Sequence, residues 1–185
     1  SREDTTLKVQ INPETGETLV SGLGELHLDA KVERKIKEKG VEIVVSPPIV
    51  VYRESIFSKS PVIEGKSPNK HNKFYISVET MSPEIYKAMT EAIIKDCEIK
   101  GKNLEIRKKL VELGMDKEDA RHVVLIHNHC MFLDCTKGIQ YLNEAMEDIK
   151  GAFIDIVENG PLAKEPCSAL VVKLMDAELH EDAVH

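Results

Sequence analysis

One apolar run near the end of the chain decides the fold of its larger part: Ser168-Ala169-Leu170-Val171-Val172-Lys173-Leu174-Met175. The run has the length of a strand and is almost wholly aliphatic, so it predicts a buried β-strand. Upstream of it, Asn143 is placed to cap a long helix that ends at the Asn-Gly-Pro of residues 159–161, and Met131–Thr136 predicts another strand. These three elements predict a β-α-β unit.

The sequence before this unit predicts two strands separated by a long polar loop. Ile49–Ile56 and Phe74–Thr80 have strand composition, whereas Ser58–Lys73 has no apolar period and contains Pro61, Gly65 and Pro68. The loop carries Lys59, Lys66, Lys70 and Lys73 against one acid, Glu64. Two interpretations remain open for it, a solvated loop or a tip that binds anions.

Three helices are expected between these strands and the β-α-β unit. Ser82 and Pro83 are typical of a helix start, and a buried face is predicted at Ile85, Ala88, Met89, Ala92 and Ile93. Residues 102–113 predict a second helix, and Asp116 caps a third that ends near Val124. Residues 48–185 therefore read β-β, a helical insertion, then β-α-β.

The first 47 residues predict a smaller unit. Residues 7–11 and 17–21 alternate with a period of two around turn chemistry, which indicates a hairpin. From Glu25 the period becomes helical, Gly40 stops the helix, and residues 41–45 predict a third strand. The domain boundary is expected near Pro47. With a β-α missing at the front, this partial β-α-β unit would belong to a ferredoxin-like layer, so the fold class is α+β.

Composition limits the possible functions. The net charge of −7 argues against a general nucleic-acid coat, although a local basic tip on an acidic body remains possible. The four cysteines have no C-x-x-C spacing and are expected to be reduced, in a cytoplasmic protein. No apolar run approaches the roughly 20 residues that span a bilayer. The first residue is not Met, and we expect the chain to be a piece of a longer protein.

The nucleotide-binding and metal-binding motifs are weak. The chain has no P-loop and no G-x-G-x-x-G, and Glu25 after Gly22-Leu23-Gly24 would repel phosphate. A metal site from His127, His129, Cys130 and Cys135 matches no common spacing, so packed or solvated side chains are favoured there. His180 and His185 would not share a helical face, and no nucleophile lies beside them.

Four motifs, in order along the chain, resemble the archaeal members of the elongation factor 2 family of ribosomal translocases. They are residues 21–28 (Ser-Gly-Leu-Gly-Glu-Leu-His-Leu), 46–54 (Ser-Pro-Pro-Ile-Val-Val-Tyr-Arg-Glu), 66–72 (Lys-Ser-Pro-Asn-Lys-His-Asn) and 179–185 (Leu-His-Glu-Asp-Ala-Val-His). The first occurs more widely among translational GTPases. The last two are specific to the archaeal and eukaryotic factor, and the short insertion between them suits an archaeal one.

This resemblance implies a fold for each part of the chain and a role for its end. Residues 1–47 would be most of the ferredoxin-like third domain, and residues 48–185 most of a fourth domain like the second domain of ribosomal protein S5, with a left-handed β-α-β crossover. His185 would be the histidine that is converted to diphthamide, the target of ADP-ribosylating toxins. The neighbouring tip that reaches the decoding centre would comprise Lys66, Ser67, Pro68, Asn69, Lys70, His71, Asn72, Lys73, His180 and Asp182.

The resemblance also implies partners and cofactors. The partners would be the ribosome, tRNA and mRNA, together with the diphthamide-synthesis enzymes and the toxins, and the chain would be a monomer away from any membrane. GTP and Mg²⁺ would belong to a GTPase domain that this chain lacks, so no cofactor and no catalytic residue is assigned here. Two alternatives stay open, a small metal-dependent enzyme built on His127, His129, Cys130 and Cys135, and a paralogous GTPase scaffold of the splicing machinery.

Overall fold

The computed structural model describes residues 6–11, 18–42, 44, 52–101 and 104–180. Its chain divides into two compact units, Ser1–Val51 and Tyr52–His185. Both units combine helices with antiparallel strands, which confirms the α+β class. The finer expectations, a ferredoxin-like layer and an S5-like domain, stay predictions.

The first unit contains a hairpin and a helix. Its elements are β1 (Lys8–Ile11), β2 (Thr18–Ser21), α1 (Glu25–Leu28), a π-helical stretch η1 (Asp29–Glu33) and α2 (Arg34–Glu38). The antiparallel pairing of β1 with β2 and the positive φ of 70° at Gly40 agree with the sequence. The expected strand at residues 41–45 is wrong for Val41, Glu42 and Val44, which pair with no strand in the described part of the unit. Ile43 and Val45 lie outside the described residues.

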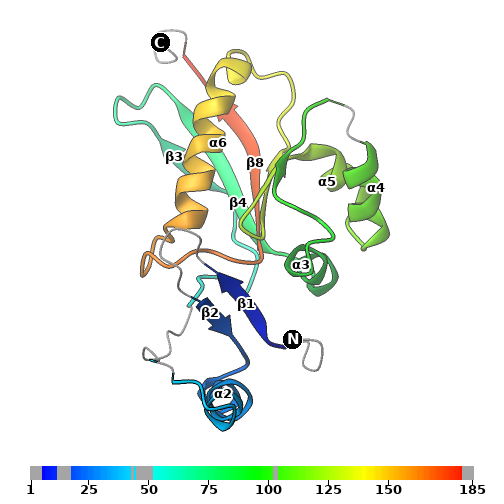
Figure 1. Ribbon diagram of the computed structural model, residues 1–185. Coiled ribbons are helices and arrows are strands. Elements are labelled where there is room, and N and C mark those ends of the chain that lie inside the picture. Colours follow the sequence, from blue (N-terminus) through cyan, green and yellow to red (C-terminus); the bar gives the residue numbers. More distant parts are fainter. Residues whose placement is uncertain (1–5, 12–17, 43, 45–51, 102–103, 181–185) are drawn as a thin grey trace. The chain divides into compact units, whose positions relative to one another are not determined.

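The second unit is built on a six-stranded sheet with the order β3-β4-β8-β7-β6-β5 (Figure 1). Its strands are β3 (Ile63–Lys66), β4 (Lys73–Thr80), β5 (Cys97–Glu98), β6 (Val123–His127), β7 (Cys130–Asp134) and β8 (Leu170–Glu178). Its helices are α3 (Pro83–Thr90), α4 (Leu104–Glu112), α5 (Lys117–His122) and α6 (Leu142–Glu158). The apolar run at residues 168–175 supplies most of β8, which pairs with β4 antiparallel and with β7 parallel. The predicted β-α-β unit is therefore β7-α6-β8.

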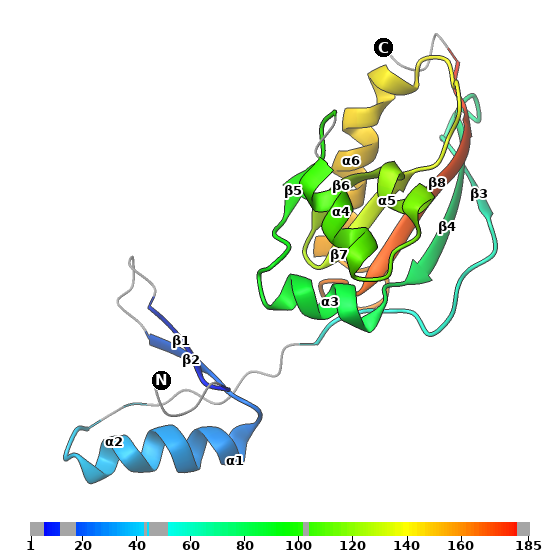
Figure 2. The ribbon, with the colours of Figure 1, turned by 90° about the vertical axis from the view of Figure 1, so that its right-hand side faces the viewer.

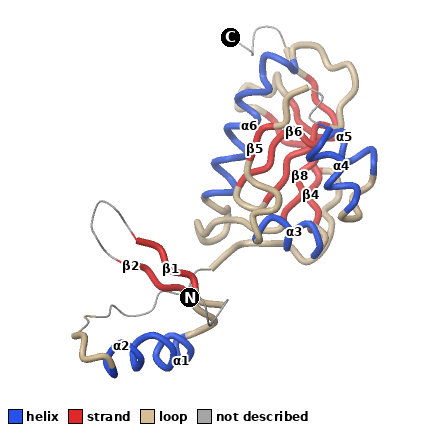
Figure 3. Tube along the Cα trace, turned by 45° about the vertical axis from the view of Figure 1, so that its right-hand side comes forward, coloured by secondary structure: helices blue, strands red, loops and turns tan. Residues whose placement is uncertain are grey.

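The sheet carries helices on both faces (Figure 3). On one face Phe153 and Val157 of α6 pack against Phe132 and Leu174. On the other face α3, α4 and α5 bury side chains that include Leu110. Neighbouring residues of β7 alternate between the two cores, as the period of a strand requires. Two apolar layers thus hold β8 in the middle of the sheet.

The single lysine in the apolar run is buried, and two carboxylates balance its charge. Lys173 on β8 lies 2.6 Å from Glu79 of β4 and 2.7 Å from Asp119 of α5. Burial alone would lower the pKa of Lys173, but the hydrogen bonds to Asp119 and Glu79 outweigh it and raise that pKa. The lysine therefore ties the helical insertion to the sheet as an ion pair.

Several predicted elements are confirmed and several are wrong. Ser82 and Asp116 cap α3 and α5 as expected. Asn143 does not cap α6, because it lies inside the helix, which begins at Leu142 after Tyr141, whose φ is 62°. Residues 52–56 of the expected strand contribute only an isolated bridge between Glu54 and Cys167, and residues 49–51 lie outside the described part. At the end of α3, the helix stops at Thr90, so Ala92 and Ile93 are not part of its buried face.

The remaining differences concern short strands. The loop predicted at residues 58–73 contains β3, and the helix predicted to end near Val124 is followed by β6 from Val123. The strands β6 and β7 are joined by Asn128 and His129, both with positive φ, which is the geometry of a two-residue hairpin turn. These strands are short and gain their stability from pairing with neighbours that are distant in sequence, so local patterns do not reveal them.

Candidate functional site

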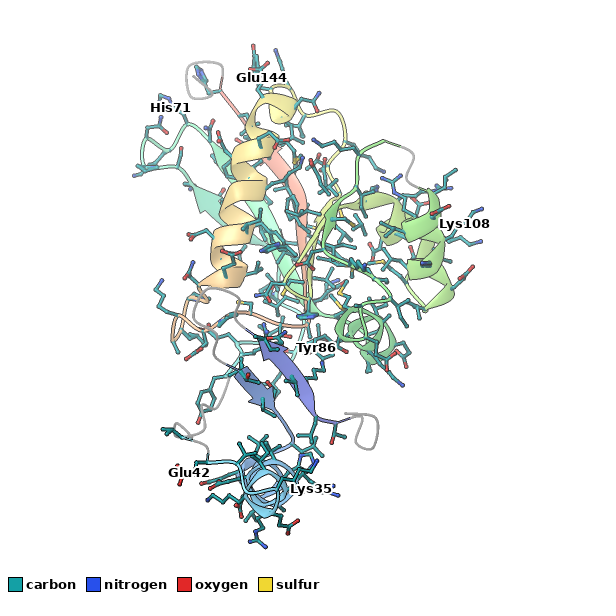
Figure 4. All side chains as sticks on the ribbon, viewed as in Figure 1. Lys35, Glu42, His71, Tyr86, Lys108 and Glu144 are labelled. Carbon is teal, nitrogen blue, oxygen red and sulfur yellow. The ribbon has the colours of Figure 1, made fainter. Side chains whose placement is uncertain are left out.

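Two segments far apart in sequence meet at one end of the six-stranded sheet (Figure 1). The backbone N–H of His180, just beyond β8, donates a 3.0 Å hydrogen bond to the side-chain oxygen of Asn72, just before β4. The rings of His71 and His180 lie 5.4 Å apart between centroids, and Figure 4 shows His71 at the outer end of the β3–β4 hairpin. We call this region, residues 66–73 with 178–180, the tip.

The tip loop is ordered by its own side chains. Ser67 and Pro68 open a turn that the Lys70 N–H closes on the carbonyl of Ser67 at 2.8 Å, and Lys70 takes a left-handed φ of 62°. The side-chain oxygen of Asn69 accepts from the His71 N–H at 3.1 Å, and the Ser67 hydroxyl accepts from the Asn72 N–H at 3.1 Å. Asn and Ser side chains therefore satisfy the backbone, while Pro68, Lys70 and His71 are exposed.

An acidic and basic network supports the loop from below. Glu178 of β8 accepts from Lys73 at 2.6 Å and from the Tyr75 hydroxyl at 2.9 Å, and the same hydroxyl lies 3.1 Å from Glu64. Glu64 also pairs with Lys66 at 2.7 Å. The hydrogen bonds from Lys73 and Tyr75 lower the pKa of Glu178, and those from Lys66 and Tyr75 lower the pKa of Glu64. The Tyr75 hydroxyl and the Lys73–Glu178 ion pair therefore link β3, β4 and β8 at this end.

This network reduces the number of loop lysines that are free to attract anions. The sequence showed four lysines against Glu64 alone, but Lys59 pairs with Glu79 and Lys73 with Glu178. These acids come from β4 and β8, so inspection of the loop alone missed them. Lys70 is the loop lysine for which the described residues offer no carboxylate at ion-pair distance. The anion-attracting part of the tip therefore narrows to Lys70 and its exposed neighbours.

A third segment, which the sequence analysis did not assign to the tip, lies toward the same end of the sheet. Because α6 returns antiparallel to β7 and β8, its first turn and the loop at residues 135–141 lie toward the end of the sheet where β8 finishes (Figure 2). The loop carries Lys137, which is exposed. The β-α-β prediction contained the signal, since the carboxyl ends of parallel strands share one edge.

Two predicted site residues lie outside the described residues. Asp182 and His185 both belong to residues 181–185, and their assignments stay predictions. The other nine predicted tip residues fall in one place, and Asn72, His71 and His180 are in mutual contact. The side chains of Lys66 and Lys73 point into the carboxylate network below the loop.

The alternative metal residues do not converge. Cys130 is buried in the core under α6, whereas Cys135 packs against the core under α3, α4 and α5. Burial raises the pKa of the Cys130 thiol to about 11, against the thiolate that a metal needs. His127 binds Glu158 at 2.8 Å and His129 stacks edgewise on Tyr86. Within the described residues, no three His, Cys, Asp or Glu side chains are grouped to hold a metal ion.

The helices of the described ranges are all too short or too polar to cross a bilayer.

Comparison with known proteins identifies the class. Residues 88–185 match the family model of elongation factor G, domain IV, and residues 1–47 match that of elongation factor G, domain III. The chain belongs to the elongation factor G family.

Along its full length the chain is 55% identical to elongation factor 2 of Pyrococcus abyssi, 54% to that of Thermococcus gammatolerans and 51% to that of Methanobrevibacter ruminantium. It spans about a quarter of the length of these curated relatives, 25% in each case. The resemblance to archaeal elongation factor 2 that the four motifs indicated is therefore confirmed.

Proposed function

We propose that this chain forms the part of an elongation factor 2 that reaches into the decoding centre of the ribosome and holds tRNA and mRNA in register during GTP-dependent translocation. The single observation that carries the proposal is the contact between Asn72 and His180. It joins the loop and the chain terminus that the family resemblance assigns to the same ribosome-facing end. Had these segments ended at opposite sides of the sheet, the proposal would fail.

The exposed chemistry of the tip suits RNA. Imidazole and amide groups of His71, Asn69 and His180 donate to phosphate oxygens and ribose 2′-hydroxyls, and these groups occur at every nucleotide. Lys70 adds a sequence-independent attraction for phosphate. The chain as a whole is acidic, with a net charge of −7, so the attraction for RNA at this end comes from the local cation rather than from the net charge.

The proposal extends to His185 and to the rest of the factor. His185 would carry diphthamide, a cationic modification made by dedicated enzymes and recognised by ADP-ribosylating toxins. A mass measurement of the His185 peptide from the native organism tests this, because diphthamide adds a defined mass. GTP and Mg²⁺ would bind in another domain of a monomeric cytoplasmic factor, and this chain would act as a positioning module without catalysis of its own.

Lys70→Glu in a full-length factor that carries this chain tests the RNA contact. We expect weaker ribosome binding, and a slope of log affinity against log salt that is smaller by about one or two, because a phosphate contact is lost and repulsion is added. Ribosome binding measured by filtration across a salt series gives both quantities. The matched control is Lys87→Glu on α3, an exposed lysine of the same charge. Equal slopes for the two variants would refute phosphate contact at Lys70.

A further inference from the structure

Residues of α4 and α5 line a groove on the helical insertion. Figure 2 shows these two helices away from the β3–β4 hairpin. It has a volume of about 590 Å³, within the range of roughly 300–1,000 Å³ that ligand and peptide side-chain pockets occupy. Its apolar lining comes from Leu104, Val111 and Ala120. Ala120 is buried, whereas Leu104 is 57% exposed. The groove therefore has an apolar floor that is open to solvent.

The rim of the groove is basic on an otherwise acidic chain. Arg107, Lys108, Lys117 and Arg121 line it, against one carboxylate, Glu112. Arg121 already pairs with Glu118 at 2.9 Å. The other three cations have no ion pair within the described residues, and Lys108 projects outward from α4 in Figure 4. The local charge is opposite to the net charge of −7.

Arg107 supplies a second, independent observation. Its Nε atom is buried and has no hydrogen-bond partner among the described residues. A buried donor that makes no hydrogen bond loses its hydration without compensation, so native proteins rarely keep one without a reason. A carboxylate bound in the groove would accept from the guanidinium in the fork geometry that arginine favours.

We propose that the α4–α5 groove docks a short acidic amphipathic segment of a partner protein. Apolar side chains of that segment would fill the floor over Leu104 and Val111, and its Asp or Glu residues would pair with Arg107, Lys108 and Lys117. The groove and the segment would have complementary charges around an apolar centre. Protein–protein interfaces are commonly arranged in this way.

RNA is the less suitable occupant. A phosphodiester backbone has no apolar group to bury on Leu104 and Val111, and unpaired bases bind by stacking on aromatic rings. The lining contains no aromatic side chain. The floor therefore selects a protein segment over a nucleic acid, although both carry negative charge.

A binding measurement on the whole 185-residue chain tests this proposal. The probe is a fluorescein-labelled 16-residue helical peptide with leucines at i, i+3, i+4 and i+7 and glutamates on its other face, titrated by fluorescence anisotropy. We expect saturable binding that weakens with salt and is lost when either the leucines become serine or the glutamates become glutamine. Both peptide controls are needed, because a purely ionic surface would tolerate the first change.

Chain variants then locate the site. Lys108→Glu should weaken binding by about fivefold and Leu104→Asp by about tenfold, because the first adds repulsion at the rim and the second places a charge on the floor. Both residues are exposed, so neither variant should impair folding, which circular dichroism checks. The matched control is Lys70→Glu at the tip, which should leave peptide affinity unchanged. The proposed RNA contact can therefore fail without affecting this result.

Three outcomes would overturn the proposal. One is the absence of saturable peptide binding, or binding that neither variant weakens. Another is binding of a 12-nucleotide oligo(U) RNA that Lys108→Glu abolishes and Leu104→Asp leaves intact, which would assign the rim to phosphate. The third is a dimer in sedimentation that Lys108→Glu dissociates, which would assign the groove to a second copy of the chain.

Discussion

Two carboxylates are fixed near opposite ends of β8, Glu54 before its first residue and Glu178 at its last, and they are held by different kinds of donor. At the start of the strand, Glu54 forms a bridge to Cys167, and its backbone oxygen accepts from the Ser168 N–H at 2.9 Å. Its carboxylate accepts hydrogen bonds from three backbone amides of the loop before β8, those of Leu162 (2.9 Å), Ala163 (2.7 Å) and Glu165 (3.3 Å). Burial raises the pKa of Glu54, but these amides and the charge of Lys164 outweigh it and lower the pKa.

At the other end of β8, the donors to Glu178 are side chains. Lys73 and Tyr75 of β4 hold its carboxylate, and no backbone amide takes part in the described bonds to it. Backbone donors cannot leave without unfolding the loop that carries them, whereas a lysine or tyrosine can rotate to another acceptor. The difference indicates a rigid base, formed by Glu54 and the loop at residues 160–168, and a tip whose side-chain donors can turn from Glu178 to phosphate and ribose oxygens.

The largest effect should come from Gly160→Ala at the base. A Cβ at this position would overlap both the carbonyl oxygen of Glu165 and the carboxylate of Glu54, and the carbonyl belongs to backbone that cannot move freely. We expect the free energy of unfolding to fall by about 2 kcal/mol, as overpacking usually costs. Urea denaturation followed by circular dichroism measures the change.

The matched control is Gly65→Ala in β3, near the tip. The nearest atom to an added Cβ there is the Phe74 carbonyl oxygen at 3.9 Å, an ordinary van der Waals contact. The expected change is within about 0.5 kcal/mol. If both alanines destabilised the chain equally, the base would be no more rigid than the tip and the comparison would be wrong.

A smaller difference should separate Glu54→Gln from Glu178→Gln. Glutamine removes the charge that the three amides face at Glu54, so Glu54→Gln should lower the melting temperature more than Glu178→Gln does. Because the folded pKa of Glu54 lies below its ordinary 4.5, its contribution to stability is present above that pH and is lost as the pH falls through the lowered value.

Scanning calorimetry from neutral to acidic pH measures this difference. The gap in melting temperature between the wild type and Glu54→Gln should be full at neutral pH and should close as the pH falls below 4.5. A gap that stays constant with pH would show that the charge of Glu54 is not what the amides stabilise.

The architecture of the larger unit could be predicted where pattern and length agree. The apolar run of β8, the caps at Ser82 and Asp116 and the helix of residues 142–158 are local signals, and each marks a real element. Strand β5 is two residues long and β3 is polar and exposed, so neither has an apolar period to detect. Strands of this kind are set by their partners.

Local sequence patterns were also insufficient to predict all of the contacts in the candidate site. The residues of the β3–β4 loop were found because they lie together in sequence as a family motif, and the contact with His180 agrees with that grouping. Glu178 was missed as a partner of Lys73 and Tyr75, because the pairing joins residues more than a hundred positions apart. The register of β4 with β8 decides it, and register follows from the whole core.

The smallest effect on stability, and the most specific readout, should come from Tyr75. Its hydrogen bond to Glu178, together with burial and the bond to Glu64, raises its pKa from 10.0 to about 12. The neutral phenol is favoured in the folded state, so its contribution to stability is present below pH 10 and is lost as the pH rises toward 12.

Spectrophotometric titration of tyrosinate, with circular dichroism to confirm folding, should show one late step that Tyr75→Phe removes. Glu178→Gln should move that step to lower pH while Glu54→Gln leaves it in place, because Glu178 accepts from the phenol and Glu54 does not contact it. A late step that survives Tyr75→Phe would show that the tip network does not hold this proton, and the distinction between side-chain donors at the tip and backbone donors at the base would lose its support.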